Sequence, residues 1–189
     1  MAPTWLSRSE GMVRSPRPSR RRHPFLFRPL PQAWPDRQSD PVTEDTTKNA
    51  LRAELTRRRA RAFAVNPMAG QTLAALFPAA LAPKGGIVSA YAPFRDEIDP
   101  MPLATRLARL GCRIALPVTP PKGSPEPLTF RLWTPGQALV RSAYGVMEPD
   151  PDLEVVHPDV VLAPLLGFDR RGHRLGWGAG HYDKALSAL

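Results

Sequence analysis

A short helical segment between two apolar runs most strongly limits how this chain can fold. Residues 99–111 read DPMPLATRLARLG, with Asp99 as an N-cap, Pro100 at the first helical position and Gly111 at the end. The spacing predicts one amphipathic helix with an apolar stripe. That stripe comprises Leu103, Leu107 and Leu110.

The runs on either side of this helix have the composition of strands. GGIVSAYAP (85–93) and CRIALPV (112–118) are apolar and rich in β-branched residues. Strand, helix and strand with short links form a βαβ unit, which brings two parallel strands together. PLTFRLW (127–133) predicts another strand, and HPDVVLAPLLGF (157–168) is continuously apolar, as expected of a strand covered on both faces. We therefore expect an α/β fold with a mainly parallel sheet, and ligands beyond the carboxyl ends of its strands.

The N-terminal part differs from the rest in composition. Residues 1–42 lack helical or strand periodicity, and the first 41 contain eight arginines, eight prolines and more than half of the formal net charge of +9. We interpret residues 1–42 as a disordered basic extension, and we expect a single domain over residues 43–189. Within the domain, helices are predicted over residues 43–63 and, between proline breaks, 66–81.

The segment GFDRRGHRLGWGAGHYDKAL (167–186) has the properties of an anion-binding loop. Three alternating glycines, Gly176, Gly178 and Gly180, let backbone N–H groups face an anion, and Arg174 adds a guanidinium. The helix predicted after them contributes a positive N-terminus, and Asp183 in its first turn suits Mg²⁺ held together with phosphate. The spacing matches neither the P-loop nor the dinucleotide-binding fingerprint. A glycine-rich turn before a helix is also common for structural reasons alone.

Three residues outside the loop are further candidates. Lys48 and Arg52 lie four apart on the first helix, so both project from one face. Either an anion binds between them, or they form an ordinary solvated basic face. Glu97 follows the strand of residues 85–93, at the edge where such sheets bind ligands, although an ordinary exposed glutamate fits the sequence equally well.

Other chemistries have little support in the sequence. Cys112, the one cysteine, lies in an apolar run and is predicted to be a buried, inert thiol in a reducing compartment. No His/Cys spacing fits zinc, no serine has the partners of a nucleophilic triad, and no apolar run reaches the length of a membrane span. The excess charge lies mainly in the extension, so we expect no nucleic-acid binding by the domain.

The motifs together resemble a known family. They are K-x-x-x-R from Lys48, Y-x-P-x-x-x-E-I-D from Tyr91, A-L-P-V from Ala115, G-V-x-E-P from Gly145, and the block FDRRGHRLGWGAGHYD over residues 168–183. This order, from about Lys48 to Leu189, resembles 5-formyltetrahydrofolate cyclo-ligase, also called 5,10-methenyltetrahydrofolate synthetase. The resemblance implies a three-layer α/β/α sandwich with a Rossmann-like sheet. Family members continue beyond this block and supply a second magnesium-binding acid there, so we expect the domain of residues 43–189 to lack its C-terminal part.

The resemblance also implies roles for individual residues. Lys48 and Arg52 match a basic pair at the ATP phosphates, and Asp183 matches a magnesium ligand. Glu97 matches an acidic residue that contacts folate, with Ala92 lining the same pocket. The ATP loop corresponds to Arg174, Leu175, Gly176, Trp177, Gly178, Ala179, Gly180, His181 and Tyr182. Trp177 and His181 also face the pterin, and His181 replaces a tyrosine common in the family. Arg174 and Lys48 are the implied catalytic cations.

The implied reaction converts 5-formyltetrahydrofolate and ATP, with Mg²⁺, into 5,10-methenyltetrahydrofolate, ADP and phosphate. The formyl oxygen is phosphorylated, and N10 then closes the ring. We expect a cytoplasmic, monomeric enzyme that binds no membrane. Two alternatives remain: a non-catalytic folate- or nucleotide-binding relative, and a polyanion-binding protein that acts through residues 1–41.

Overall fold

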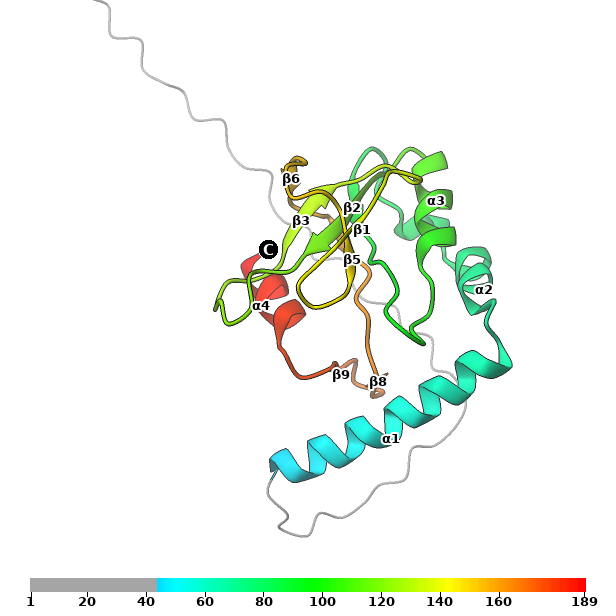
Figure 1. The fold of residues 1–189 in the computed structure, drawn as a ribbon. Helices are drawn as coiled ribbons and strands as arrows, with labels where there is room; N and C mark the ends of the chain where they lie inside the picture. The colour runs from blue at the N-terminus through cyan, green and yellow to red at the C-terminus, as the bar shows by residue number, and fades with distance from the viewer. Residues whose placement is uncertain (1–43) are drawn as a thin grey trace, which may run out of the picture. The chain divides into compact units, whose positions relative to one another are not determined.

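The computed structural model describes residues 44–189, so the predicted extension of residues 1–42 lies outside the described part (Figure 1). The helices are α1 (Glu44–Val65), α2 (Ala69–Leu76), the 3-10 helix η1 (Ala79–Leu81), α3 (Met101–Arg109) and α4 (His181–Ala188). The strands are β1 (Ile87–Ser89), β2 (Arg113–Val118), β3 (Thr129–Leu132), β4 (Val140–Arg141), β5 (Met147–Glu148), β6 (Val155–Val156), β7 (Val160–Val161), β8 (Gly167–Phe168) and β9 (Arg174–Leu175).

Five strands form one sheet in the order β6-β3-β2-β1-β7. β1 pairs parallel with both β2 and β7, and Val88 lies opposite Ile114 and Val160. β3 pairs antiparallel with β2 and with β6, so β3 alone runs against the other four strands. The predicted mainly parallel sheet is therefore confirmed, and β1, α3 and β2 form the predicted βαβ unit.

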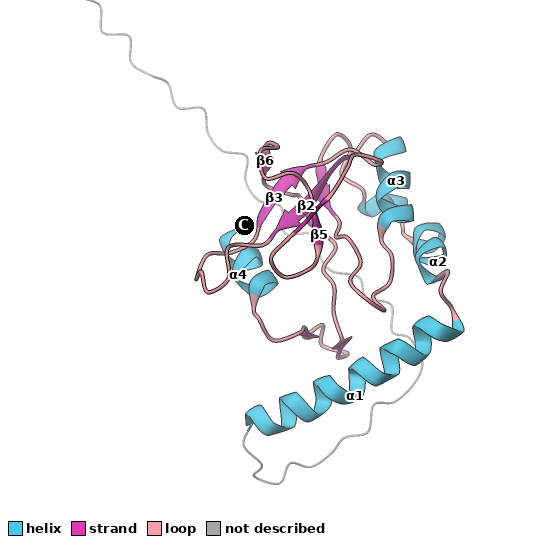
Figure 2. Cartoon of the chain, in the orientation of Figure 1, coloured by secondary structure: helices cyan, strands magenta, loops and turns pink. Residues whose placement is uncertain are grey.

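Helices pack on both faces of this sheet, as Figure 2 shows. On one face, Val88 and Ile114 join Leu103 and Leu107 of α3 and Ala74 of α2 in a buried cluster. On the other face, a second cluster contains a residue of α4. Its buried members are Ile87, Ala115, Leu128, Phe130, Val156 and Ala185. Neighbouring strand residues alternate between the two clusters, because successive side chains of a strand point to opposite faces.

The predicted βαβ helix is correct in place but not in every detail. It begins at Met101 rather than Pro100, and the Asp99 carboxylate accepts a hydrogen bond from the Met101 N–H (2.9 Å). Leu103 and Leu107 are fully buried, whereas Leu110 is half exposed because the helix ends at Arg109. The prediction that Leu110 belongs to the buried stripe was wrong.

The predicted strand over residues 157–168 is also corrected. Its central part is the two-residue strand β7, which is half-buried and lies at the edge of the sheet among the described strands. Two prolines, Pro158 and Pro164, limit regular pairing because proline has no N–H to donate. Gly167 and Phe168 pair separately, as β8, with β9.

Cys112 behaves as predicted. It is buried between α3 and β2, its Sγ donates a hydrogen bond to the Pro83 carbonyl (3.3 Å), and burial raises the pKa of the thiol. A raised pKa disfavours the thiolate and makes the sulfur a poor nucleophile. No described helix combines the length and the apolar composition needed to cross a bilayer.

Candidate ligand-binding site

The glycine loop connects β9 to α4. β8 and β9 form a hairpin, and the Arg174–Leu175 strand runs directly into the loop of residues 176–180. Gly178 has φ +108° and Gly180 has φ +68°, conformations that L side chains rarely adopt. Gly180 also accepts a backbone hydrogen bond from Lys184 (3.0 Å) as α4 begins at His181. The glycines therefore shape the turn that starts the helix.

This loop forms one wall of a cavity of about 290 Å³. The cavity lies where β1, β2 and β7 end, because its lining includes Ala92, Thr119 and Pro164, which follow those three strands. Its position is the carboxyl edge predicted from the βαβ pattern. Of the residues singled out from the sequence, those that line the cavity are Arg52, Ala92, Glu97 and every residue from Arg174 to Asp183.

Lys48 has a different position from the other candidates. It lies on α1 one turn before Arg52, its side chain is exposed, and it is not among the residues that line the cavity. Of the pair predicted to share one helical face, Arg52 thus lines the cavity and Lys48 does not.

Arg52 connects α1 to the glycine loop. Its Nε donates to the Gly176 carbonyl (3.3 Å), and one terminal nitrogen donates to Asn49 Oδ1 (2.8 Å). A Cβ placed on Gly178 would lie 3.4 Å from Arg52 Cζ, so the guanidinium packs against the loop backbone. The absence of a side chain at Gly178 thus leaves room for a cation beside the loop.

Arg174 and Asp183 form an ion pair at the same wall. One terminal nitrogen of Arg174 donates to Asp183 Oδ1, and another donates to the Pro164 carbonyl (3.2 Å). The Arg174 side chain is largely buried, whereas that of Asp183 is 75% exposed. The two residues predicted to serve phosphate and magnesium are therefore direct neighbours, and at present they neutralise each other.

Glu97 is buried, contrary to the exposed alternative allowed by the sequence. Its Oε2 accepts a hydrogen bond from the Phe94 N–H (2.9 Å), and its Oε1 accepts one from Trp177 Nε1 (3.0 Å). The indole bond spans 80 residues of sequence and joins the loop after β1 to the glycine loop. Glu97 and Trp177 therefore form one unit on the cavity wall.

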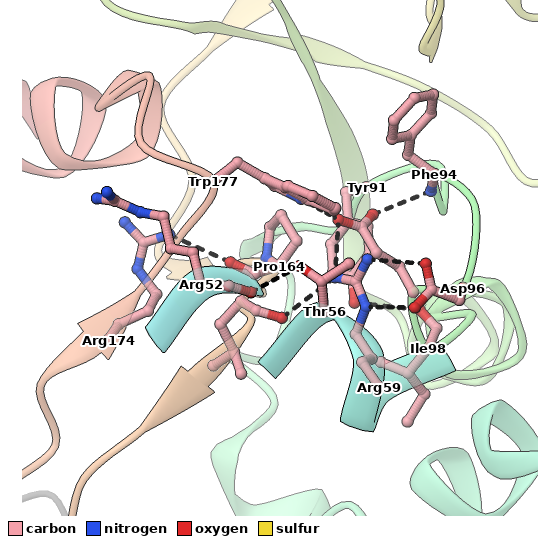
Figure 3. Close-up of polar contacts among 12 residues, drawn as sticks. Arg52, Thr56, Arg59, Tyr91, Phe94, Asp96, Ile98, Pro164, Arg174 and Trp177 are labelled. Atoms are coloured by element: carbon pink, nitrogen blue, oxygen red, sulfur yellow. Dashed lines mark hydrogen bonds and ion pairs between the residues drawn. The ribbon is translucent and has the colours of Figure 1, made fainter. Parts of the chain in front are cut away.

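Arg59 completes this unit, as Figure 3 shows, and was not predicted from the sequence. Its Nε and one terminal nitrogen donate to the two carboxylate oxygens of Asp96 (3.1 Å each), and another nitrogen lies 3.6 Å from Glu97 Oε1. The guanidinium also covers the Trp177 ring at 4.8 Å. The Arg59 hydrogen bonds hold the pKa of Asp96 below its usual range. Arg59 follows Arg52 by seven residues, which is two helical turns, and this spacing was the signal that could have identified Arg59 in the sequence.

Two buried polar atoms in the cavity wall have no hydrogen-bond partner among the described residues: His181 Nδ1 and the Tyr182 hydroxyl. Burial, together with nearby Tyr91 and Glu97, raises the pKa of Tyr182. The Tyr144 and His181 rings meet edge to face, with centroids 5.5 Å apart. Since buried polar groups are nearly always paired, both atoms are suited to bond a ligand.

The residues that line the cavity are suited to hold magnesium through a single carboxylate, that of Asp183. No cluster of three or more His, Cys, Asp or Glu side chains suited to a metal occurs in the described part of the chain. Mg²⁺, however, commonly takes one or two carboxylates and completes its shell with water and substrate phosphates. The exposed Asp183 carboxylate beside the glycine loop meets that requirement.

The fold and the site define the class first: an α/β protein with a cationic glycine loop and a buried carboxylate around one cavity at the carboxyl edge of its sheet. Residues 44–189 match the model of the 5-formyltetrahydrofolate cyclo-ligase family. The chain therefore belongs to this family.

Individual relatives agree with this assignment. The chain is 40% identical over 108 residues to a 5-formyltetrahydrofolate cyclo-ligase of Mycolicibacterium smegmatis, covering 54% of this chain and 55% of the relative. It is 38% identical over 103 residues to the enzyme of that name from Escherichia coli, covering 52% and 56%. The chain thus spans about half the length of the curated relatives it matches.

A solved structure supports the fold. The structure of 5,10-methenyltetrahydrofolate synthetase from Aquifex aeolicus matches with a TM-score of 0.59 at 23% identity. The match covers 75% of this chain and 73% of that one. At this identity the likeness bears on the fold, which is a mixed α/β arrangement with a mostly parallel sheet.

Proposed function

We propose that this protein catalyses the ATP-dependent conversion of 5-formyltetrahydrofolate to 5,10-methenyltetrahydrofolate, with release of ADP and phosphate. The observation that carries the proposal is a single cavity lined both by the cationic glycine loop and by the buried Glu97–Trp177 unit. A reaction between ATP and a second, amine-bearing substrate needs both kinds of wall within reach of one another.

The cationic wall suits the phosphates. Arg52 and Arg174 flank backbone N–H groups of residues 176–180, and α4 directs its N-terminus to the same place. For Arg174 to contact phosphate, it must exchange its present partner Asp183 for the ligand. Asp183 would then hold Mg²⁺, which neutralises charge on the phosphate oxygens when bound. Lys48 extends the positive surface along α1.

The second wall suits the folate. Ala92 and Glu97 contribute from the loop after β1, and Trp177 and His181 contribute aromatic faces on which a pterin can stack. His181 Nδ1 and the Tyr182 hydroxyl supply polar atoms whose hydrogen bonds are still to be made. The ligand would thereby satisfy groups that the protein alone leaves unpaired.

The chemistry needs positioning more than a protein nucleophile. The formyl oxygen of the substrate attacks the γ-phosphorus of ATP, and the bond from that phosphorus to ADP breaks. The N10 amine then attacks the formyl carbon and loses its proton, and phosphate leaves with the former formyl oxygen. Arg52, Arg174 and the loop N–H groups stabilise the negative charge that moves during transfer.

A second candidate is a folate- or nucleotide-binding relative without turnover. The observation that favours it is the ion pair between Arg174 and Asp183, which occupies the two side chains that phosphate and Mg²⁺ would need. It requires the same contacts but no phosphoryl transfer. The three-layer architecture, the cytoplasmic location and the monomeric state stay predictions under either candidate.

The test uses the full chain with 5-formyltetrahydrofolate and Mg-ATP, following the absorbance of the methenyl product. Turnover that Arg174→Ala abolishes, and that Arg170→Ala retains, would support the cyclo-ligase. Arg170 is a suitable control because it lies in the exposed β8–β9 turn, outside the cavity. Calorimetric binding of 5-formyltetrahydrofolate without product formation would favour the second candidate.

A further inference from the structure

A second buried carboxylate, Glu148, lines the same cavity and has no role in the function proposed above. It belongs to β5, which pairs with β4 in a small hairpin, and it is only 5% exposed. Neither the glycine loop nor α1 supplies it, so it arises from a separate part of the fold.

One oxygen of Glu148 is fixed by the residue that follows β2. Oε1 accepts a hydrogen bond from the Thr119 hydroxyl (2.6 Å) and a second from the Thr119 backbone N–H (3.2 Å). These two bonds set the position of the carboxylate, because they anchor it to the carboxyl end of a central strand. Glu148 is thus held in a defined orientation.

The other oxygen has no protein partner. Among the described residues, Oε2 accepts no hydrogen bond and no basic side chain forms an ion pair with Glu148. Glu97 differs, because Arg59, Trp177 and the Phe94 N–H all surround it. Oε2 is not among the buried side-chain atoms that lack a partner, so it is open to the space of the cavity. The donor for Oε2 is therefore expected from the cavity.

The surroundings of Glu148 indicate which part of a ligand reaches it. Apolar side chains line the cavity beside it: Pro117, Leu128, Val146 and Met147. Such a lining suits a flat ring, whereas phosphates and the glutamate tail of folate are repelled by the carboxylate. The donor is therefore an N–H on a ring edge.

We propose that Glu148 Oε2 recognises the 2-amino and N3–H edge of the pterin ring. This edge offers two neighbouring donors and no acceptor between them. Adenine fits less well, since its amino group lies beside the acceptor N1, which a carboxylate repels. The proposal rests on the function proposed above and assigns Glu148 as a specificity-determining residue for its folate substrate.

Glu148→Gln separates this role from the structural bond to Thr119. Glutamine keeps an oxygen for Thr119 and replaces Oε2 with an NH₂ group, which repels the pterin donors. Calorimetry should show a roughly 10- to 100-fold weaker affinity for 5-formyltetrahydrofolate, as expected for one lost bond to a charged group, with ATP affinity unchanged. Glu154→Gln, on an exposed residue beside β6, is the matched control.

A substrate analogue tests the same contact from the other side. In 2-desamino-2-methyl-5-formyltetrahydrofolate, a methyl group replaces the 2-amino donor. Wild-type protein should bind it about 10-fold or more weakly than the parent compound, and Glu148→Gln should bind the two with similar affinity.

Several outcomes would overturn the proposal. The proposal would be overturned if the wild type bound 5-formyltetrahydrofolate and its 2-methyl analogue with equal affinity, and this comparison needs no folded variant. The proposal would also be overturned if a folded Glu148→Gln protein kept its affinity for 5-formyltetrahydrofolate, or if it lost affinity for ATP alone. In each of these cases the proposed function stands, because the wild type still binds 5-formyltetrahydrofolate. A wild type that binds neither 5-formyltetrahydrofolate nor ATP would overturn both.

Discussion

The indole of Trp177 donates a hydrogen bond to Glu97 over 3.0 Å, and this bond joins the glycine loop to the loop after β1. The two residues lie 80 positions apart in sequence. Arg59 packs over the same indole and also contacts the same carboxylate oxygen. The two sides of the cavity, proposed above to bind phosphate and folate, are therefore linked through one aromatic side chain.

Trp177→Phe should separate the packing of this side chain from its hydrogen bond. Phenylalanine retains a ring beneath Arg59 but has no N–H for Glu97. We expect the free energy of unfolding in urea to fall by about 1.5 kcal/mol, as for a lost bond to a charged acceptor. We also expect the KM for 5-formyltetrahydrofolate to rise more than that for ATP. Equal changes in both KM values would contradict this assignment.

Arg59 should matter for stability more than an ordinary surface cation. Arg59→Gln removes the partner of Asp96 and Glu97, both of which are largely buried, and should cost about 3 kcal/mol. Arg59→Lys should restore only part of this, because an ammonium cannot bond both Asp96 oxygens at once. Arg57→Gln, on an exposed pair with Glu54, is the control and should change stability by less than about 0.5 kcal/mol. If Arg59→Gln lowered the free energy of unfolding as little as Arg57→Gln, the role of Arg59 in stability would be refuted.

The Asp96–Arg59 pair should also give a defined pH dependence. Because the pKa of Asp96 is lowered in the folded protein, the unfolded protein binds a proton first as the pH falls. The contribution of the pair is complete above the unfolded pKa, about 3.9, and disappears as the pH falls through the lower folded value. The difference in unfolding free energy between wild type and Asp96→Asn should therefore be constant from pH 7 to about pH 5 and shrink below about pH 4. A difference that grows on acidification would contradict this.

Gly178→Ala should impair ATP binding beyond its cost in backbone strain. Alanine at φ +108° is strained, and its Cβ would meet the Arg52 guanidinium at 3.4 Å. We expect ATP affinity to fall by about 10-fold or more, since the loop and Arg52, the cation proposed to bind phosphate, both shift. Gly136→Ala carries comparable strain at φ +96° but lies in an exposed turn after β3, outside the cavity. It should lose stability without losing ATP affinity; an equal loss in both variants would attribute the effect to strain alone.

Asp183→Asn should change magnesium dependence with little change in stability. The Asp183 side chain is 75% exposed, so its pair with Arg174 should contribute less than about 0.5 kcal/mol. The Mg²⁺ concentration needed for half-maximal turnover should rise by about 10-fold or more, because asparagine is a neutral and weaker ligand. Asp152→Asn, in an exposed turn, is the control. An unchanged Mg²⁺ requirement would contradict the proposal that Asp183 holds magnesium.

The parts of the fold that local pattern determines were predictable. Helix α3 between β1 and β2 follows from its apolar spacing and its flanking strands, and α4 begins directly after the glycine-rich turn, as predicted. Leu110 was misassigned because the helix ends one residue earlier than the stripe suggests. The strand over residues 157–168 was overextended because apolar composition alone does not reveal where prolines interrupt pairing.

The site was only partly predictable, for a related reason. The glycine loop, Arg52 and Glu97 belong to motifs, and they do line one cavity. The roles of Arg59 and Glu148 depend on partners 37 and 29 residues away, Asp96 and Thr119, which no local pattern connects. Contacts of this kind become visible only when the sheet brings separate loops to one edge.

Helix α1 carries a consequence for the dynamics of the site. It reaches the glycine loop through Arg52, the loop after β1 through Arg59 and β8 through Leu55, while much of its remaining surface is exposed. Among the side chains that the structure describes, none from α1 belongs to the two buried clusters of the sheet and the other helices. Local opening of α1 can therefore dismantle the cavity while the sheet stays folded. A ligand that bridges α1 and the loop would slow amide hydrogen exchange in α1 by a factor that grows with the ratio of the free ligand concentration to its Kd.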